Sequence, residues 1–131
     1  HTFANNSASQ VAAAKLIDLL SDGVLANCRR QGAYLRDGLL AMQGDYPEIG
    51  DVRQAGLHIG VELVRDPESK EPLDEEGPAV RTEAMERGLI LGLAGPRRNI
   101  LKVKPPLIVT QDECDEILDK LGQALHAVLR A

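Results

Sequence analysis

Residues 50–63 read GDVRQAGLHIGVEL, a segment typical of a tight β-hairpin. In its second half, Leu57, Ile59, Val61 and Leu63 alternate with His58, Gly60 and Glu62, as in a strand with one buried face. We therefore predict two short strands, over residues 49–54 and 57–64, joined at Ala55-Gly56.

Two helices are predicted ahead of this hairpin. Apolar residues from Val11 to Leu20, with alanines between them, predict a buried helix that begins near Ser7 or Ser9 and ends at residues 21–23. A second helix should end near residues 43–45 and turn several apolar residues inward: Val24, Leu25, Cys28, Leu35, Leu39 and Leu40. We expect the two helices to form a helical hairpin.

The segment after the strands predicts a second group of elements. Residues 65–76 are polar and contain two prolines, which favours a surface loop, and a helix should begin at Pro78 and end at Gly88. Strands are predicted over residues 89–93 and 100–103, before Pro105-Pro106. Thr110 and Glu113 form a capping-box pattern at the start of a long final helix. The order ααββαββα predicts an α+β fold, with a small antiparallel or mixed sheet covered by helices.

Composition limits the function classes. A chain of 131 residues with 44% hydrophobic residues is typical of one globular domain. It contains no apolar run near the roughly 20 residues of a membrane helix and no signal-peptide pattern, so we expect a soluble protein without a membrane partner. The net charge of -5 and the lack of a basic stripe argue against nucleic acid. Cys28 and Cys114 are predicted to be buried free thiols without chemistry, as in a reducing cytoplasm.

No complete catalytic set can be assembled from spacing alone. His1, His58 and His126 are scattered, and Gly88, Gly92 and Gly95 do not open a helix as a dinucleotide fingerprint does. Candidate functional residues must therefore come from longer motifs.

Three motifs occur in a recognisable order: TFANN at residues 2–6, the hairpin segment at residues 50–63, and NILKVKPPL at residues 99–107. Together they resemble class III pyridoxal-phosphate (PLP) aminotransferases over essentially the whole chain. The resemblance implies that residues 1–131 form a single C-terminal small domain of a larger, homodimeric PLP enzyme. It also implies that the large domain with the PLP-binding lysine precedes residue 1, in keeping with a chain that opens without Met.

Thr2 is the candidate cofactor-binding residue. A hydroxyl and backbone N–H groups ahead of a helix suit a phosphate, but from the residues alone the favoured interpretation is that Thr2 or Ser7 caps that helix, which is the usual use of such residues. The resemblance implies that Thr2 holds the PLP phosphate of the neighbouring subunit. Ala4-Asn5 stand where the family has two glycines, and Ser7 where it has a proline, so the family's backbone contacts are not expected unchanged.

Lys102 is the candidate substrate-binding residue. Many relatives carry an arginine here, whose planar fork grips a carboxylate in two hydrogen bonds, and a lysine cannot reproduce that fork. The Lys-Val-Lys-Pro-Pro version looks more like the branch that includes phospho-lyases of phosphorylated amino alcohols. The alternative is a solvent-facing lysine on an edge strand. Arg53 is expected to pair with a neighbouring carboxylate, and Glu62 to be solvated.

The expected activity is transfer of an amino group between an amine or amino acid and a 2-oxo acid. Two alternatives remain: a PLP-dependent phospho-lyase acting on a phosphorylated amino alcohol, and a non-enzymatic binding or regulatory module. Lys15 lies inside the first predicted helix and does not replace the missing cofactor lysine, so we expect no catalytic residue in this chain and no activity from it alone.

Overall fold

The fold of the chain is known from a computed structural model, which describes residues 6–130. Its centre is an antiparallel sheet of four strands in the order β1-β2-β4-β3: β1 (Ile49–Ala55), β2 (His58–Leu63), β3 (Gly92–Ala94) and β4 (Ile100–Val103). Helices precede, interrupt and follow the strands in the expected order. The predicted α+β class is therefore confirmed, and the sheet is antiparallel throughout.

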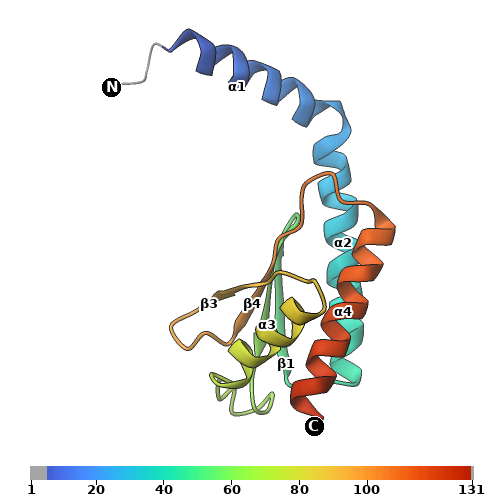
Figure 1. The fold of residues 1–131 in the computed structure, drawn as a ribbon. Helices are drawn as coiled ribbons and strands as arrows, with labels where there is room; N and C mark the ends of the chain where they lie inside the picture. Colours follow the sequence, from blue (N-terminus) through green and yellow to red (C-terminus); the bar gives the residue numbers. More distant parts are fainter. Residues whose placement is uncertain (1–5, 131) are drawn as a thin grey trace.

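Within residues 6–130, helices cover only one face of this sheet. The alternating residues of β2 and β4 that the sequence placed inside are buried, and α2 (Leu25–Ala41), α3 (Glu76–Glu86) and α4 (Gln111–Leu129) pack against the sheet or against one another. Figure 1 shows α2 and α4 running side by side along the sheet. The core includes Leu35, Leu39, Ile59, Val61, Leu63, Val80, Leu101, Val103, Leu121 and Leu125. The other face of the sheet carries charged residues, glycines and Ile100.

The hairpin turn fixes the position of α2. Gly56 has φ +59°, a conformation that favours glycine, and a Cβ on Gly32 of α2 would lie 2.3 Å from the Gly56 carbonyl oxygen. The Gln54 side chain donates to the same oxygen at 2.9 Å. The close contact between helix and turn therefore depends on glycine at residue 32.

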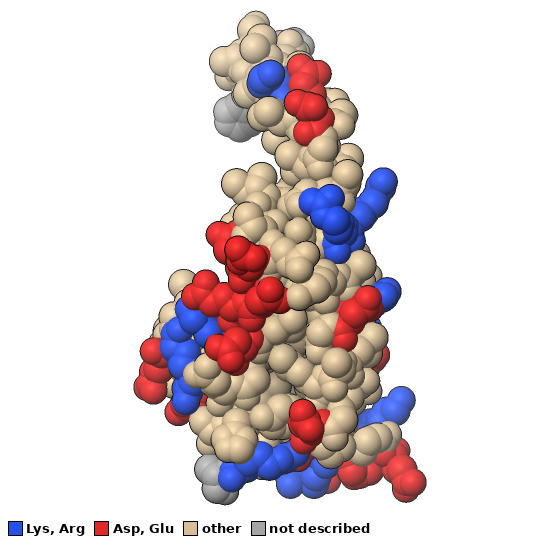
Figure 2. All heavy atoms as spheres, turned by 90° about the vertical axis from the view of Figure 1, so that its right-hand side faces the viewer, with Lys and Arg blue, Asp and Glu red and all other residues tan. Residues whose placement is uncertain are grey.

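The prediction of a buried first helix is wrong. Helix α1 (Ser7–Leu19) begins where expected but has no buried residue, and Val11 and Ile17 are 71% and 63% exposed. Figure 1 shows α1 extending away from the rest of the domain, and in Figure 2 its surface is largely uncharged. An apolar pattern identifies a helix that can be covered, but it does not say which part of a protein covers it.

The predicted helical hairpin is also wrong. Between α1 and α2 lies a kinked turn, η1 (Leu20–Val24), in which Asp22 and Gly23 leave helical geometry, Gly23 with φ +89°. The residues that should stop the helix do interrupt it, but the chain bends and continues into α2. A short helical turn, η2 (Met42–Gly44), then ends α2 as predicted.

Smaller differences between the prediction and the structure concern the exposure of two side chains and the bounds of two elements. Leu25 and Leu40 were expected to face inward but are 44% and 40% exposed. The strand predicted over residues 89–93 is β3 at Gly92–Ala94, because pairing with β4 begins only at Gly92. Helix α3 begins at Glu76, two residues before Pro78.

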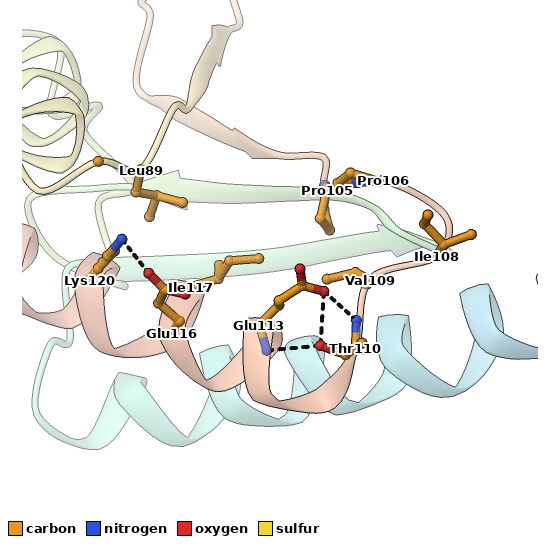
Figure 3. Close-up of a pocket in the computed structure, with 11 residues that line it drawn as sticks. Leu89, Pro105, Pro106, Ile108, Val109, Thr110, Glu113, Glu116, Ile117 and Lys120 are labelled. Atoms are coloured by element: carbon orange, nitrogen blue, oxygen red, sulfur yellow. Dashed lines mark hydrogen bonds and ion pairs between the residues drawn. The ribbon is translucent and has the colours of Figure 1, made fainter.

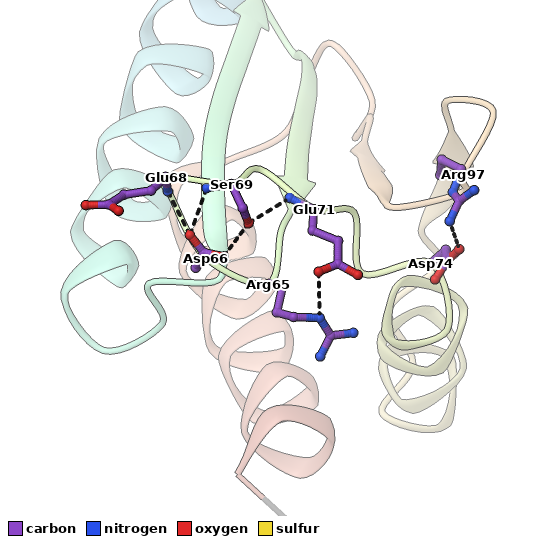
Figure 4. Close-up of polar contacts among 7 residues, drawn as sticks. All are labelled: Arg65, Asp66, Glu68, Ser69, Glu71, Asp74 and Arg97. Atoms are coloured by element: carbon purple, nitrogen blue, oxygen red, sulfur yellow. Dashed lines mark hydrogen bonds and ion pairs between the residues drawn. The ribbon is translucent and has the colours of Figure 1, made fainter.

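The polar segment after β2 is an ordered loop, as predicted. Asp66 accepts hydrogen bonds from the Glu68 and Ser69 backbone N–H groups at 3.0 and 2.8 Å and from the Ser69 hydroxyl (Figure 4). These bonds hold the pKa of the Asp66 carboxyl below its ordinary value, with the Ser69 hydroxyl as the main cause. Arg65 pairs with Glu71 at 3.4 Å, so side chains on both limbs of the loop are joined.

Helix α4 begins with the predicted capping box. The Glu113 N–H donates to the Thr110 hydroxyl oxygen at 3.3 Å, and the Glu113 carboxylate accepts from the Thr110 N–H at 2.8 Å. The bond from that backbone N–H, followed by one from the hydroxyl, lowers the pKa of Glu113. Within residues 6–130, the helices are all too short or too polar to cross a bilayer.

Candidate functional site

Lys102 lies in the middle of the open face of the sheet. It belongs to β4, an interior strand that is paired with β2 on one side and β3 on the other. Its direct partners in these two ladders are both glycines, Gly60 and Gly92. The expectation of an edge strand is therefore wrong, because the edges of the sheet are β1 and β3. The Lys102 side chain is half-buried, and no hydrogen bond or ion pair to it occurs within the described residues.

A second charged group on this face is internally paired. Arg53 of β1 contacts Glu62 at 2.7 Å and Asp51 at 3.2 Å, which confirms the expected ion-pair role of Arg53. These three residues line a polar hollow of about 320 Å³ beside Lys70. Because both carboxylates already face the guanidinium, Arg53 is not available to an anionic ligand, and the exposed Lys70 is the other cation that lines this hollow.

Thr2, the candidate cofactor contact, lies outside the described residues, so its role stays a prediction. The cap of α1 is Asn6, whose side-chain oxygen accepts from the Ser9 N–H at 3.0 Å. Ser7 is the first residue of the helix and does not serve as its cap.

An apolar groove next to Pro105-Pro106 is a feature that the sequence did not predict. It has a volume of about 490 Å³ and lies between α4 and the segments that flank β3 and β4 (Figure 3). Leu89, Ile108, Val109 and Ile117 contribute to its walls. The paired prolines were a usable signal, since they force the chain to leave the sheet, but their spacing did not show which surface they would enclose.

The polar groups of this groove do not suit PLP. Its carboxylates are Glu113, held in the capping box, and Glu116, which pairs with the Lys120 ammonium at 2.5 Å. A phosphate would meet two negative charges and one cation that is already paired. Apart from Lys102 and Lys120, the lysines are Lys15, Lys70 and Lys104, and all three are exposed. This groove therefore does not suit the cofactor by itself.

The two cysteines lie on neighbouring helices, Cys28 on α2 and Cys114 on α4. Cys114 is fully buried, and burial is the main cause that raises its thiol pKa. Its thiol lies 3.9 Å from the Gln31 side-chain oxygen, to which it donates. Cys28 is only half-buried, so the prediction of two buried thiols is correct for Cys114 alone. A protonated, enclosed thiol is a poor nucleophile, and we assign Cys114 to packing.

Comparison with known proteins identifies the family. A sequence model described as aminotransferase class-III matches residues 1–125. The chain belongs to the class III aminotransferase family. The resemblance drawn from the three sequence motifs is thereby confirmed.

Individual relatives of the class III family differ in activity. The chain is 37% identical to an isoleucine 2-epimerase of Lentilactobacillus buchneri over 97% of its own length, but over only 28% of that protein. It resembles the crystal structure of a Bacillus anthracis aminotransferase with a TM-score of 0.88 and 30% identity, covering 98% of this chain and 30% of the other. An Arthrobacter phospholyase, solved with phosphoethanolamine, gives a TM-score of 0.79 at 26% identity, covering 89% and 27%.

These class III relatives are much longer than this chain. The chain spans less than a third of the epimerase and of both solved structures.

Proposed function

We propose that the chain is the C-terminal small domain of a longer class III enzyme that uses PLP to transfer an amino group between an amine or amino acid and a 2-oxo acid. The observation that carries this proposal is the match to the Bacillus anthracis aminotransferase, which covers nearly all of this chain and 30% of that one. The cofactor lysine would lie in the larger part of the parent protein.

In this parent, the chain would contribute binding groups. The Lys102 ammonium would bind the anionic end of the substrate, since it is half-buried, faces outward and has no protein partner among the described residues. The Thr2 hydroxyl would donate to the PLP phosphate bound by the other subunit of a cytoplasmic homodimer. PLP, when bound, supplies an electron sink for the substrate's α-carbon.

A phospho-lyase is the second candidate. Lys102 favours it, because an ammonium satisfies a phosphate as a point charge, whereas a carboxylate gains more from the fork of an arginine. The structural likeness to the phospholyase solved with phosphoethanolamine supports the same alternative. The similarity to an isoleucine 2-epimerase adds a third outcome that the test must detect, inversion of an amino acid without amino transfer.

The test uses the full-length protein encoded by the gene, purified with PLP. Three measurements are made on one preparation: amination of 2-oxo acids, release of phosphate from phosphorylated amino alcohols, and loss of optical rotation from L-amino acids. We expect amino transfer to dominate. Phosphate release or racemisation without amino transfer would replace the proposed reaction, and a protein with no PLP absorbance would point to a non-enzymatic module.

A further inference from the structure

Lys102 occupies one position of a row that crosses all four strands. The ladders pair Arg53 with Gly60, Gly60 with Lys102, and Lys102 with Gly92. Lys102 therefore has a glycine on each side. In an antiparallel sheet, directly opposed side chains on one face lie about 5 Å apart, so residues without side chains leave room for a long neighbour.

The two glycines do not contribute equally to this room. A Cβ on Gly92 would lie 2.7 Å from Lys102 Cε, 3.3 Å from its Cβ and 3.5 Å from its ammonium nitrogen. A Cβ on Gly60 would meet Ile100 Cγ2 at 3.3 Å and no Lys102 atom within 4 Å. The lysine side chain thus lies over Gly92, toward the β3 edge, and not over Gly60.

The charged groups at the β1 end of this row are already paired with one another. Arg53, at the β1 end of the row, is engaged by Glu62 and Asp51. Lys102 leans away from these carboxylates and has no ion-pair partner within residues 6–130. Of the two cations in this row, Arg53 is paired with carboxylates, and the Lys102 ammonium is available to bind an incoming anion.

We propose that Gly92 is a positioning residue for Lys102: the space above its Cα holds the lysine alkyl chain and keeps the ammonium at the β3 edge, directed at the carboxylate or phosphate of the substrate. The inference rests on the proposed function for the identity of the anion. It goes beyond that function by identifying Gly92 as the residue that determines the position of the Lys102 ammonium. Any side chain at residue 92 would compete with Lys102 for the same space.

The smallest replacement, Gly92→Ala, is well suited to test this idea. The atom nearest to the new methyl group is the end of a flexible side chain, so Lys102 can move while the strands remain in place. Gly92 is not among the residues with positive φ, so alanine adopts its backbone conformation without strain. Gly60→Ala is the matched control, because it adds the same methyl group on the other side of Lys102 without approaching it.

The experiment compares wild type, Gly92→Ala, Gly60→Ala, Lys102→Ala and the Gly92→Ala/Lys102→Ala double variant of the full-length enzyme. KM and kcat are measured with an α-carboxylate donor, a phosphorylated amino alcohol and a neutral amine. Gly92→Ala should raise KM for the accepted anionic substrate about tenfold, the equivalent of one weakened charged contact, and leave the neutral amine unchanged. In the double variant it should add nothing to the effect of Lys102→Ala, because the group it displaces is gone.

A second readout follows Lys102 directly. All lysines of the full-length enzyme are reductively methylated with ¹³C, including the five in the 131-residue chain. The Lys102 methyl signal is identified by its loss in Lys102→Ala. Gly92→Ala should shift this signal and Gly60→Ala should not.

The possible failures are distinguishable. An enzyme without PLP-dependent turnover of any of the three substrates would refute the proposed function. An active enzyme whose KM values and Lys102 signal are the same in wild type and Gly92→Ala would overturn the positioning role alone. An equal loss in the presence and absence of Lys102 would also overturn it, since Gly92 would then act through the backbone.

Discussion

Arg130, the residue that follows α4, holds Glu48, which precedes β1, through hydrogen bonds of 2.7 and 2.8 Å. The same guanidinium donates to the Asp45 carbonyl at 3.0 Å and lies 5.2 Å from the centre of the Tyr46 ring. This contact joins the end of the last helix to the segment between η2 and the sheet. It connects residues 82 positions apart and so stabilises the fold rather than one element.

The first prediction follows from this pair. Arg130→Ala should lower the free energy of unfolding at pH 7 by more than Arg36→Ala does, because it leaves the Glu48 carboxylate, 19% exposed, without its main partner. Urea unfolding monitored by circular dichroism provides the measurement. Arg36→Ala is the control, since the exposed Arg36–Asp37 pair should contribute almost nothing.

The same pair predicts a dependence on pH. The bond from Arg130 is the main cause that lowers the pKa of Glu48 below its ordinary value of 4.5. A carboxyl with a lowered folded-state pKa stabilises the protein fully above its unfolded pKa, and this contribution is lost as the pH falls through the folded pKa. Glu48→Gln should therefore lose stability relative to wild type at pH 7, and the difference should shrink below about pH 4.5. A constant difference from pH 7 to pH 3 would contradict this account.

The second prediction concerns the contact between α2 and the hairpin turn. Gly32→Ala should lower the free energy of unfolding by about 3 kcal/mol, because the new Cβ would lie 2.3 Å from a backbone oxygen that cannot move away cheaply. Gly122→Ala on α4 is the matched control. Its Cβ would meet only Met42 Cε at 3.8 Å, so helix propensity should stabilise this variant by roughly 0.5 kcal/mol. Equal effects of the two substitutions would show that the close approach at Gly32 is not a constraint.

The sequence predicted the elements of this fold better than their packing. The alternation through Leu57–Leu63 and the Thr110/Glu113 pattern are local signals, and both correspond to observed elements. The exposure of Val11 and Ile17 could not be predicted, because periodicity defines an apolar face without naming its partner. Likewise, Lys102 was recognised from its motif, whereas its two glycine neighbours are determined by strand pairing with residues outside that motif.

The third prediction concerns the isolated chain and PLP. Because the charges that line the apolar groove do not suit PLP, a mixture of chain and PLP treated with borohydride should give no stoichiometric pyridoxyl adduct at one lysine. Mass spectrometry of the digested product measures modification at each of the five lysines. Low, similar labelling of all exposed lysines is the expected background. A specific adduct at Lys15 would show that the chain binds the cofactor alone and would overturn its assignment to a larger enzyme.

The fourth prediction concerns Thr2 in the full-length parent. If its hydroxyl donates to the PLP phosphate across the dimer, Thr2→Val should weaken PLP retention by about 1.5 kcal/mol, the lower range for a hydrogen bond to a charged group. Dialysis followed by absorbance measures the retained cofactor, and thermal unfolding of the apo-protein serves as the control. Unchanged retention would remove Thr2 from the cofactor site, and a fall in thermal stability alone would assign it a structural role.

The fifth prediction concerns Lys102, whose charge carries most of the information about substrate. Lys102→Ala should raise KM strongly for anionic substrates and little for simple amines, because only the former lose a charge partner. Lys104→Ala is the matched control, since Lys104 is exposed, lies two residues further along and has no partner among the described residues.

Lys102→Arg separates the two leading reactions. In an aminotransferase it should improve the use of α-carboxylate donors, because the guanidinium supplies two parallel hydrogen bonds, whereas in a phospho-lyase it should bring no such gain. The measurement is a substrate panel of 2-oxo acid amination and phosphate release on wild type and the three variants. Identical kinetics in all four enzymes would mean that Lys102 does not meet the substrate, and the choice between the two reactions would then have to be made from other residues of the parent.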